Sequence, residues 1–231
     1  MYKYEIHAHT SECDLVARLS GVELVRAYAD QGYSGMVITD HYFSIFFDWF
    51  GEELAGKSHR QIIDRWLRGY ESARNEGEKI GFTVLPGAEV RIDGTINDYL
   101  VYGLELDDFY RLPLLNRMKS IDEVLDILPE YTCVVHAHPF RNSMTVCDPG
   151  RFFGIEVHNG GTEPFRNQLA RTWATHYGKA MTSGSDCHGP WAWALAAASC
   201  PSTPIIPMWA LPAILTPIPQ PWPGSRKCIP T

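Results

Sequence analysis

The stretch YEIHAHTSECD, residues 4–14, places two histidines two positions apart at the end of a predicted strand. Successive side chains of a β-strand point to opposite faces, so His7 and His9 are expected to point the same way. Asp14 follows in the loop after them. An imidazole pair beside a carboxylate is typical of a metal site, and later strands end in the same kinds of residue.

Seven short apolar segments are predicted to form strands: 3–7, 35–41, 81–89, 99–104, 132–138, 154–159 and 180–186. Helices are predicted over 20–33, 58–79, 120–129 and 162–178. Ser20 with Glu23, and Ser58 with Gln61, form capping boxes that start the first two. Apolar strands alternating with helices imply parallel strands and an α/β architecture. Seven strands suggest a barrel, and an open sheet fits the pattern too.

Composition narrows the function classes. The 231 residues carry a net charge of -7, which disfavours non-specific nucleic acid binding because that needs a basic surface. The six cysteines form no CxxC pair and the start MYKYEIH is not that of a signal peptide, so reduced thiols and a cytoplasmic location are expected. The chain also lacks a nucleophile elbow, a phosphate-binding glycine loop and a dinucleotide fingerprint.

Residues 190–231 form a tail unlike the rest of the chain. No Asp, Glu, Lys or Arg occurs from Cys187 to Ser225, and most of the prolines fall there. That many prolines disfavour a transmembrane helix. The sequence therefore predicts a folded domain over 1–189, followed by an irregular apolar, Pro-rich tail that is disordered or the product of a frameshift.

Metal-binding residue types gather where the predicted strands end, which is where functional groups collect in α/β barrels. In chain order these residues are His7, His9, Asp40, His41, Glu89, His136, His138, Glu156, His158, Asp186 and His188. Seven of the nine histidines of the chain lie at these ends, which independent structural roles do not explain. Imidazoles and carboxylates suit Zn²⁺, Mn²⁺ or Fe²⁺, and their number indicates a cluster in which Glu89 bridges two ions.

The motifs HAHTSECD, TDH, GAE, HAHPFR, IEVHN and GSDCH occur in an order and spacing that resembles the PHP (polymerase and histidinol phosphatase) superfamily. The resemblance covers residues 4–189. It implies a distorted (β/α)7 barrel and a PHP-like metal-dependent hydrolase domain over 1–189. It also implies two or three divalent ions and hydrolysis of a small phosphomonoester or phosphodiester, as in a histidinol-phosphatase-like enzyme, through a metal-activated water.

The same resemblance implies a role for each matching residue. The first ion would be held by His7, His9, Glu89 and Asp186; the second by Glu89 and His138; the third by Asp14, His41 and His188. Arg141 would bind the substrate phosphate, and His138 or His188 would assist proton transfer to the leaving group. Asp98, in NDYLVYGL, stands where many members have a histidine and is a predicted oxygen ligand.

Other strand-end residues are given supporting roles. His136 and His158 are candidates for a supporting or substrate-contacting role. Asp40 is expected to orient His41, and Glu156 to be buried and hydrogen-bonded. The aromatic segment 41–50 is interpreted either as packing under the barrel rim or as an apolar wall beside the metals.

Two other functions remain open. An amidohydrolase-type enzyme that cleaves a C–N bond would share the opening HxH and the late aspartate, but the chain shows no evident bridging lysine. An inactive, metal-stabilised PHP module with a role in assembly or regulation would fit the unusual tail and Asp98.

Overall fold

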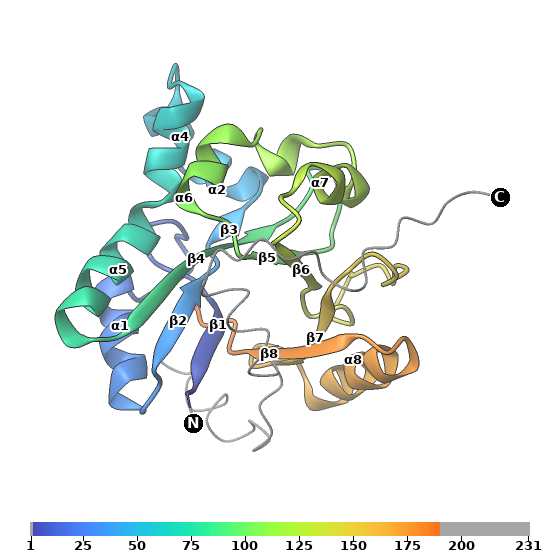
Figure 1. The fold of residues 1–231 in the computed structure, drawn as a ribbon. Helices are drawn as coiled ribbons and strands as arrows, with labels where there is room; N and C mark the ends of the chain where they lie inside the picture. Colours follow the sequence, from blue (N-terminus) through green and yellow to red (C-terminus); the bar gives the residue numbers. More distant parts are fainter. Residues whose placement is uncertain (1, 190–231) are drawn as a thin grey trace.

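Strand β1 (Tyr4–Ala8) lies at one end of an eight-stranded sheet that curves into a nearly closed barrel (Figure 1). The computed structural model describes residues 2–189. The strands follow the order β1-β2-β4-β5-β6-β7-β8, and β3 pairs with β4. A bridge between Ala8 and Cys187 links the first strand to the segment after the last one. The α/β barrel expected from the sequence is confirmed.

The later strands match the predicted apolar segments closely. They are β2 (Gly35–Ile38), β3 (His41–Tyr42), β4 (Thr83–Val90), β5 (Tyr99–Tyr102), β6 (Cys133–His136), β7 (Gly154–Asn159) and β8 (Ala180–Gly184). The short strand β3 was not expected. It forms because the chain beyond β2 continues in the same direction and pairs, again in parallel, with the far end of β4.

The helices are α1 (Gly21–Asp30), α2 (Ser44–Trp49), α3 (Gly51–Leu54), α4 (His59–Trp66), α5 (Arg68–Ile80), α6 (Leu106–Arg111), α7 (Ile121–Ile127) and α8 (Pro164–His176), with a 3-10 turn η1 (Leu115–Arg117). The capping boxes at Ser20 and Ser58 are both present, as predicted. The helix expected over 58–79 is divided in two at Leu67.

The prediction of all-parallel strands is wrong at one strand. β5 runs antiparallel to both β4 and β6. Residues 91–98 join β4 to β5 with no helix between them, so the chain returns at once beside the strand it left. A parallel neighbour would need a longer crossover, usually through a helix.

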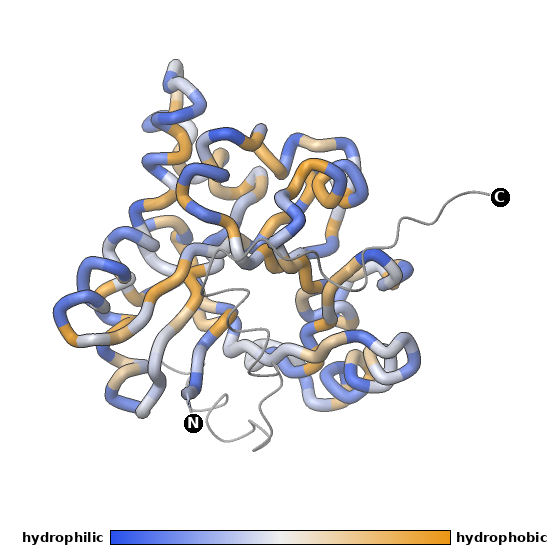
Figure 2. Tube along the Cα trace, in the orientation of Figure 1, coloured by the Kyte–Doolittle hydropathy of each residue, from blue (hydrophilic) through white to orange (hydrophobic). Residues whose placement is uncertain are grey.

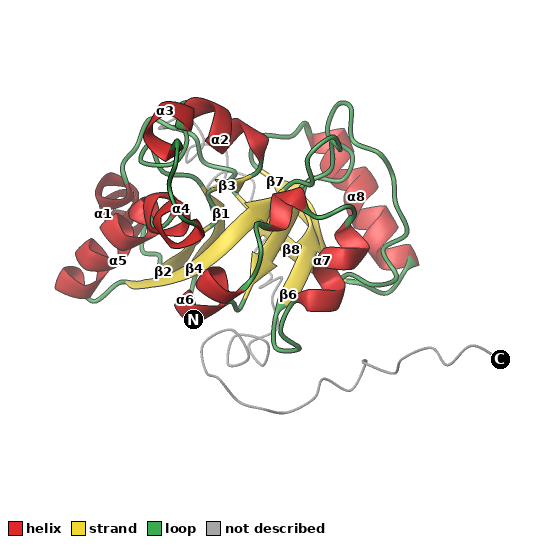
Figure 3. Cartoon of the chain, turned by 90° about the horizontal axis from the view of Figure 1, so that it is seen from above, coloured by secondary structure: helices red, strands yellow, loops and turns green. Residues whose placement is uncertain are grey.

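The helices lie around the outside of the sheet (Figure 3). Apolar residues dominate strands such as β2 and β4, whereas the helices and turns alternate between polar and apolar (Figure 2). Inside the barrel, the hydroxyl of Tyr102 on β5 donates to the carbonyl of Ile6 on β1 over 2.9 Å. Because these strands are not neighbours, this bond crosses the interior, where a small cluster includes Val37, Leu100 and Val135.

The predictions made for residues 190–231 lie outside the described residues, and the domain boundary at residue 189 stays a prediction. Within residues 2–189, no helix combines the length and the apolar character of a membrane span.

Candidate metal centre

The two histidines of the opening motif meet at one point, as strand alternation predicts. His7 and His9 are fully buried, and their ring centroids lie 5.2 Å apart. Both Nε2 atoms face Oδ1 of Asp186, at 3.5 Å from His7 and 3.2 Å from His9. Asp186 follows β8, so residues beside the first and the last strand of the barrel lie in the same cluster.

Glu89, near the end of β4, stands at the centre of the cluster. Its Oε1 lies 3.4 Å from Nε2 of His7 and 3.0 Å from Nε2 of His138. Its Oε2 lies 3.5 Å from Nε2 of His9 and 3.1 Å from Nε2 of His41. Each oxygen therefore faces its own pair of imidazoles, which is the arrangement a bridging carboxylate requires.

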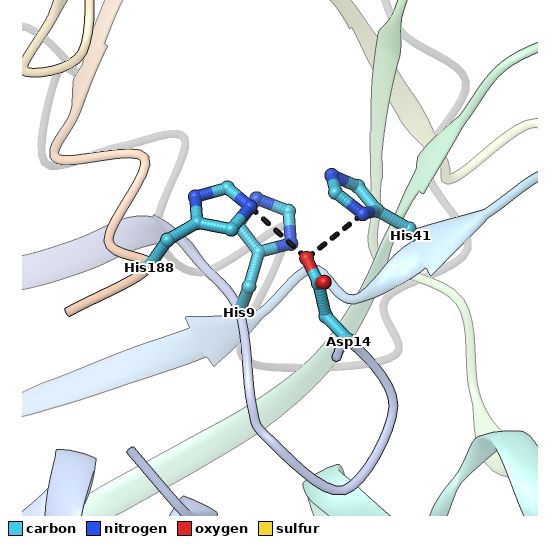
Figure 4. A group of neighbouring side chains, drawn as sticks. All are labelled: His9, Asp14, His41 and His188. Atoms are coloured by element: carbon cyan, nitrogen blue, oxygen red, sulfur yellow. Dashed lines mark ion pairs between the residues drawn. The ribbon is translucent and has the colours of Figure 1, made fainter. Parts of the chain in front are cut away.

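We call His9, Asp14, His41 and His188 the histidine end of the site (Figure 4). Oδ2 of Asp14 lies 2.9 Å from Nδ1 of His41 and 3.0 Å from Nε2 of His188. The ring of His9 stacks 4.2 Å from the ring of His188. Possible ligand atoms from three separate parts of the chain thus come together at this end.

We call Glu89, Asp98 and His138, with Arg91 and Arg141, the arginine end. Arg91 pairs with both oxygens of Asp98, at 2.6 and 2.7 Å. Nη1 of Arg141 lies 3.2 Å from Nε2 of His138 and 3.0 Å from Oδ2 of Asp186. Oδ2 of Asp98 is 3.8 Å from Nε2 of His138. Here the donor atoms share the space with guanidinium groups.

The donor atoms of both ends fit metal ions. They fall into four groups whose atoms lie within 4.8 Å of one another: His9, Asp14, His41 and His188; His7, His9 and Glu89; His7, His138 and Asp186; and Glu89, Asp98 and His138. Several of these buried atoms have no hydrogen-bond partner, among them Nε2 of His7, both ring nitrogens of His9 and Oδ1 of Asp186. Unpartnered buried polar atoms are costly, and a cation bound by them would remove that cost.

The charges around the site separate its histidines into two kinds. Burial, with His188 and His41 beside it, lowers the pKa of His9 to about 3, so its ring is neutral and has a free lone pair. Burial also lowers the pKa of His41, but Asp14 and Glu89 outweigh it and raise that pKa to about 10. A cation would take the place of that proton between the ring and the two carboxylates.

Glu89 and Asp186 favour the ionised form in spite of their burial. Burial raises the pKa of Glu89, but His7, His138 and His41 hold it well below the usual value. Burial likewise opposes ionisation of Asp186, and its neighbours His7 and His9 lower its pKa well below the usual value. The protein therefore provides buried negative charge that would attract a cation.

Two predicted ligands adopt a backbone conformation that is unusual for residues with a side chain. His138 has φ 27° and Asp186 has φ 53°, in the left-handed region. Such strain persists where the surrounding structure enforces it, and it clusters at functional sites. Each residue lies two positions beyond a strand end, where the turn aims its side chain into the cluster.

Glu156 is buried and hydrogen-bonded, as expected, and its role is more specific than a fixed strand end. Its Oε1 lies 2.8 Å from Nδ1 of His7, and its Oε2 accepts from the backbone N–H of His138 and the amide of Asn159. The carboxylate therefore sets the ring orientation of His7 from the side opposite Glu89. The sequence missed Glu5, which accepts from the N–H groups of His7 and Ser185 beneath the site.

The role predicted for Asp40 is wrong. Its carboxylate accepts from the backbone N–H of Thr10 over 2.6 Å and from the Thr10 hydroxyl over 2.8 Å. His41 is oriented by Asp14 instead. Adjacent residues in an extended chain point to opposite sides, which carries the carboxylate of Asp40 away from the ring of its neighbour.

His136 and His158 belong to none of the four donor groups. His136 is buried beside the rings of Tyr99 and Phe152, and its Nδ1 lies 3.5 Å from Sγ of Cys147. Burial lowers its pKa to about 3. His158, on β7, is partly buried, and burial lowers its pKa too. Neither position supports a direct role in the cluster.

Residues of the aromatic segment 41–50 fit both interpretations, packing under the barrel rim and an apolar wall beside the site. Phe46, on α2, is buried in the main core, as packing under the rim requires. Phe43 lies beside the site, with its ring 4.5 Å from the ring of His41. The guanidinium of Arg91 lies 4.4 Å from the centre of the Phe43 ring on its face.

Known proteins resemble the chain in a stretch of sequence and in fold. A family model described as PHP-associated matches residues 164–196. A two-domain protein from Bacteroides vulgatus, which contains a predicted PHP-like metal-dependent phosphoesterase, has a TM-score of 0.61 at 17% identity, over 82% of this chain and 53% of its own. The family model agrees with the predicted resemblance to the PHP superfamily over residues 164–196, and the neighbour agrees with it in fold. This chain spans about half of that two-domain protein.

Two further structural neighbours are matched over most of their own length. A predicted metal-dependent phosphoesterase from Bifidobacterium adolescentis has a TM-score of 0.51 at 15% identity, over 81% of this chain and 88% of its own. An amidohydrolase from Chromobacterium violaceum, with bound sulfate and no metal, has a TM-score of 0.52 at 15% identity with the same coverage. At these identities the likeness shows the fold. No curated protein matches the chain.

Proposed function

We propose that the chain is a metal-dependent phosphoesterase that hydrolyses a small phosphomonoester or phosphodiester. The observation that carries the proposal is Glu89, whose two oxygens each face two imidazoles within 3.5 Å. The fold shared with PHP-like phosphoesterases supports it. The mixed nitrogen and oxygen donors suit Zn²⁺, Mn²⁺ and Fe²⁺ as a class.

Two ion positions are proposed first. One is bounded by His7, His9, Glu89 and Asp186, and the other by Asp14, His41 and His188 at the histidine end, with His9 adjacent. A further donor group, Glu89, Asp98 and His138, lies beside Arg91 and Arg141 at the arginine end. Bound divalent ions would supply a water of lowered pKa and positive charge beside the phosphoryl oxygens.

The protein's own groups would bind the phosphate and move the proton. Arg141 is the substrate-binding candidate, since its side chain is 40% exposed while Nη1 reaches Asp186 inside the site. A planar guanidinium can hold two phosphoryl oxygens. His188 is the candidate proton donor, because its side chain is 21% exposed and thus reaches the rim, whereas His138 is buried.

A panel of phosphoesters tests the proposal. The purified chain would be reconstituted with Mn²⁺ or Zn²⁺ and assayed on sugar phosphates, histidinol phosphate, nucleotides and short oligonucleotides. The expected result is turnover that depends on added metal and is lost in His9→Ala. Absence of turnover on every phosphoester, with ions bound, would favour the inactive module with a role in assembly or regulation.

The amidohydrolase among the structural neighbours keeps C–N hydrolysis as a second candidate. The same reconstituted protein would be assayed on cyclic amides. Turnover of amides without turnover of phosphoesters would support that candidate. A cytoplasmic location is also proposed, because the four cysteines within residues 2–189 are free thiols.

A further inference from the structure

Asp98 is the predicted ligand that differs most from the others in its surroundings. Each of the other carboxylates of the site has at least one oxygen that faces an imidazole within 3.5 Å, whereas both oxygens of Asp98 are bound by one guanidinium. Nε of Arg91 lies 2.6 Å from Oδ1, and Nη2 lies 2.7 Å from Oδ2. This two-point geometry is the strongest form of an arginine–carboxylate pair.

Arg91 is held in that position by its own packing. It directly follows β4, and Asp98 directly precedes β5, so the antiparallel turn brings the two side chains together. The guanidinium lies on the ring of Phe43, 4.4 Å from its centre, and Phe43 is buried. A cation over an aromatic face is stabilised there. The pair is therefore fixed from two sides.

The second donor at this end also faces a guanidinium. Nε2 of His138, the atom that would bind an ion, lies 3.2 Å from Nη1 of Arg141. Nε2 of His138 lies 3.8 Å from Oδ2 of Asp98, a separation that an ion bound by both atoms can span. An ion between Asp98 and His138 would lie close to two positive groups, which repel it.

We propose that Arg91 takes the charge-balancing place of a metal ion at the arginine end, so that the chain holds two ions tightly and not three. The inference rests on the proposed metal-dependent function. Arg91 is a positioning residue in this account: it fixes Asp98 and leaves Arg141 and His138 to face the substrate. Removing the charge of Arg91 frees both oxygens of Asp98 for an ion.

Metal counting tests this directly. The full chain would be equilibrated with Mn²⁺, freed of unbound ions and analysed for manganese per chain. We expect two ions in the natural protein, three in Arg91→Met, and two in Arg91→Lys, which keeps the charge. Arg26→Met is the matched control, because Arg26 pairs with Glu76 over 2.8 Å on the outer helices, and it should leave the count at two.

Thermal unfolding would confirm that each variant is folded, and Arg91→Gln would replace Arg91→Met where the latter is not. Three ions in the natural protein, or two in a folded, neutral Arg91 variant, would overturn the inference. The outcome is separate from that of the proposed function. Two bound ions without phosphoester turnover would overturn only the function, whereas three ions with turnover would overturn only the inference.

Discussion

The two ends of the site use different means to balance buried negative charge. At the histidine end, Asp14 lies between His41 and His188, whose nitrogens are 2.9 and 3.0 Å away. At the arginine end, Asp98 is held at both oxygens by Arg91. Imidazoles give up a proton to a metal ion near neutral pH, but a guanidinium does not. The histidine end is therefore suited to hold an ion, and the arginine end to hold substrate.

The largest effect is expected at the histidine end. Asp14→Asn would replace a charged ligand by a neutral amide between two histidines, and we expect turnover to fall about a thousandfold as an ion is lost. Steady-state kinetics with metal analysis would measure both changes. Asp122→Asn, an exposed carboxylate paired with Arg151, is the control. Full activity with one ion missing would contradict the claim that the histidine end holds an ion needed for turnover.

The next effect is expected at the arginine end, and it should be of another kind. Arg141→Ala would remove the proposed phosphate contact, and kcat/KM is expected to fall about a hundredfold with the metal count unchanged. Arg151→Ala, which alters a half-exposed arginine paired with Asp122 and Asp126, should have no effect. A loss of bound metal in Arg141→Ala would contradict the assignment of metal binding to one end of the site and substrate binding to the other.

A substitution of Glu156 tests whether one carboxylate positions ligands of the metal site. Its carboxylate contacts the ring of His7 and the backbone of His138. Glu156→Gln keeps the shape, and the affinity for Mn²⁺ is expected to fall about 10- to 100-fold, as is usual when a ligand's outer partner is changed. Isothermal titration would measure it, with the exposed Glu71→Gln as control. Unchanged affinity would mean that His7 is oriented without Glu156.

The smallest effect concerns a histidine outside both ends. Burial lowers the pKa of His136 from 6.5 to about 3, so the folded protein keeps this ring neutral while the unfolded chain takes up a proton below pH 6.5. The free energy of unfolding should therefore decrease by about 1.4 kcal/mol per pH unit from this group as pH falls below 6.5. Denaturant unfolding would show a shallower pH dependence in His136→Leu. An identical pH dependence would place His136 in a more polar environment.

Much of the fold and of the cluster follows from the sequence because two simple rules apply. Apolar strands alternate with helices over most of the chain, and strand alternation directs His7 and His9 to one face. The carboxyl ends of the strands lie on one side of a barrel, so Glu89 and Asp186 were expected near them. These rules use only spacing and strand ends, which the sequence shows.

What the sequence did not reveal depends on contacts between distant segments. β5 runs antiparallel because eight residues, 91–98, return without a helix, and no periodicity signals that turn. Asp40 contacts Thr10 and not its neighbour His41. Arg91 carries no motif, and its importance appears only when the turn places it against Asp98 and Phe43. Partner choice of this kind is set by tertiary packing.

The most direct test of the account is the anomalous scattering of manganese in crystals of the natural protein grown with Mn²⁺. The account predicts two strong peaks: one within His7, His9, Glu89 and Asp186, and one beside Asp14, His41 and His188. It predicts no strong peak between Asp98 and His138. Peaks absent from the first two positions, or a third of equal height beside Asp98, would contradict it.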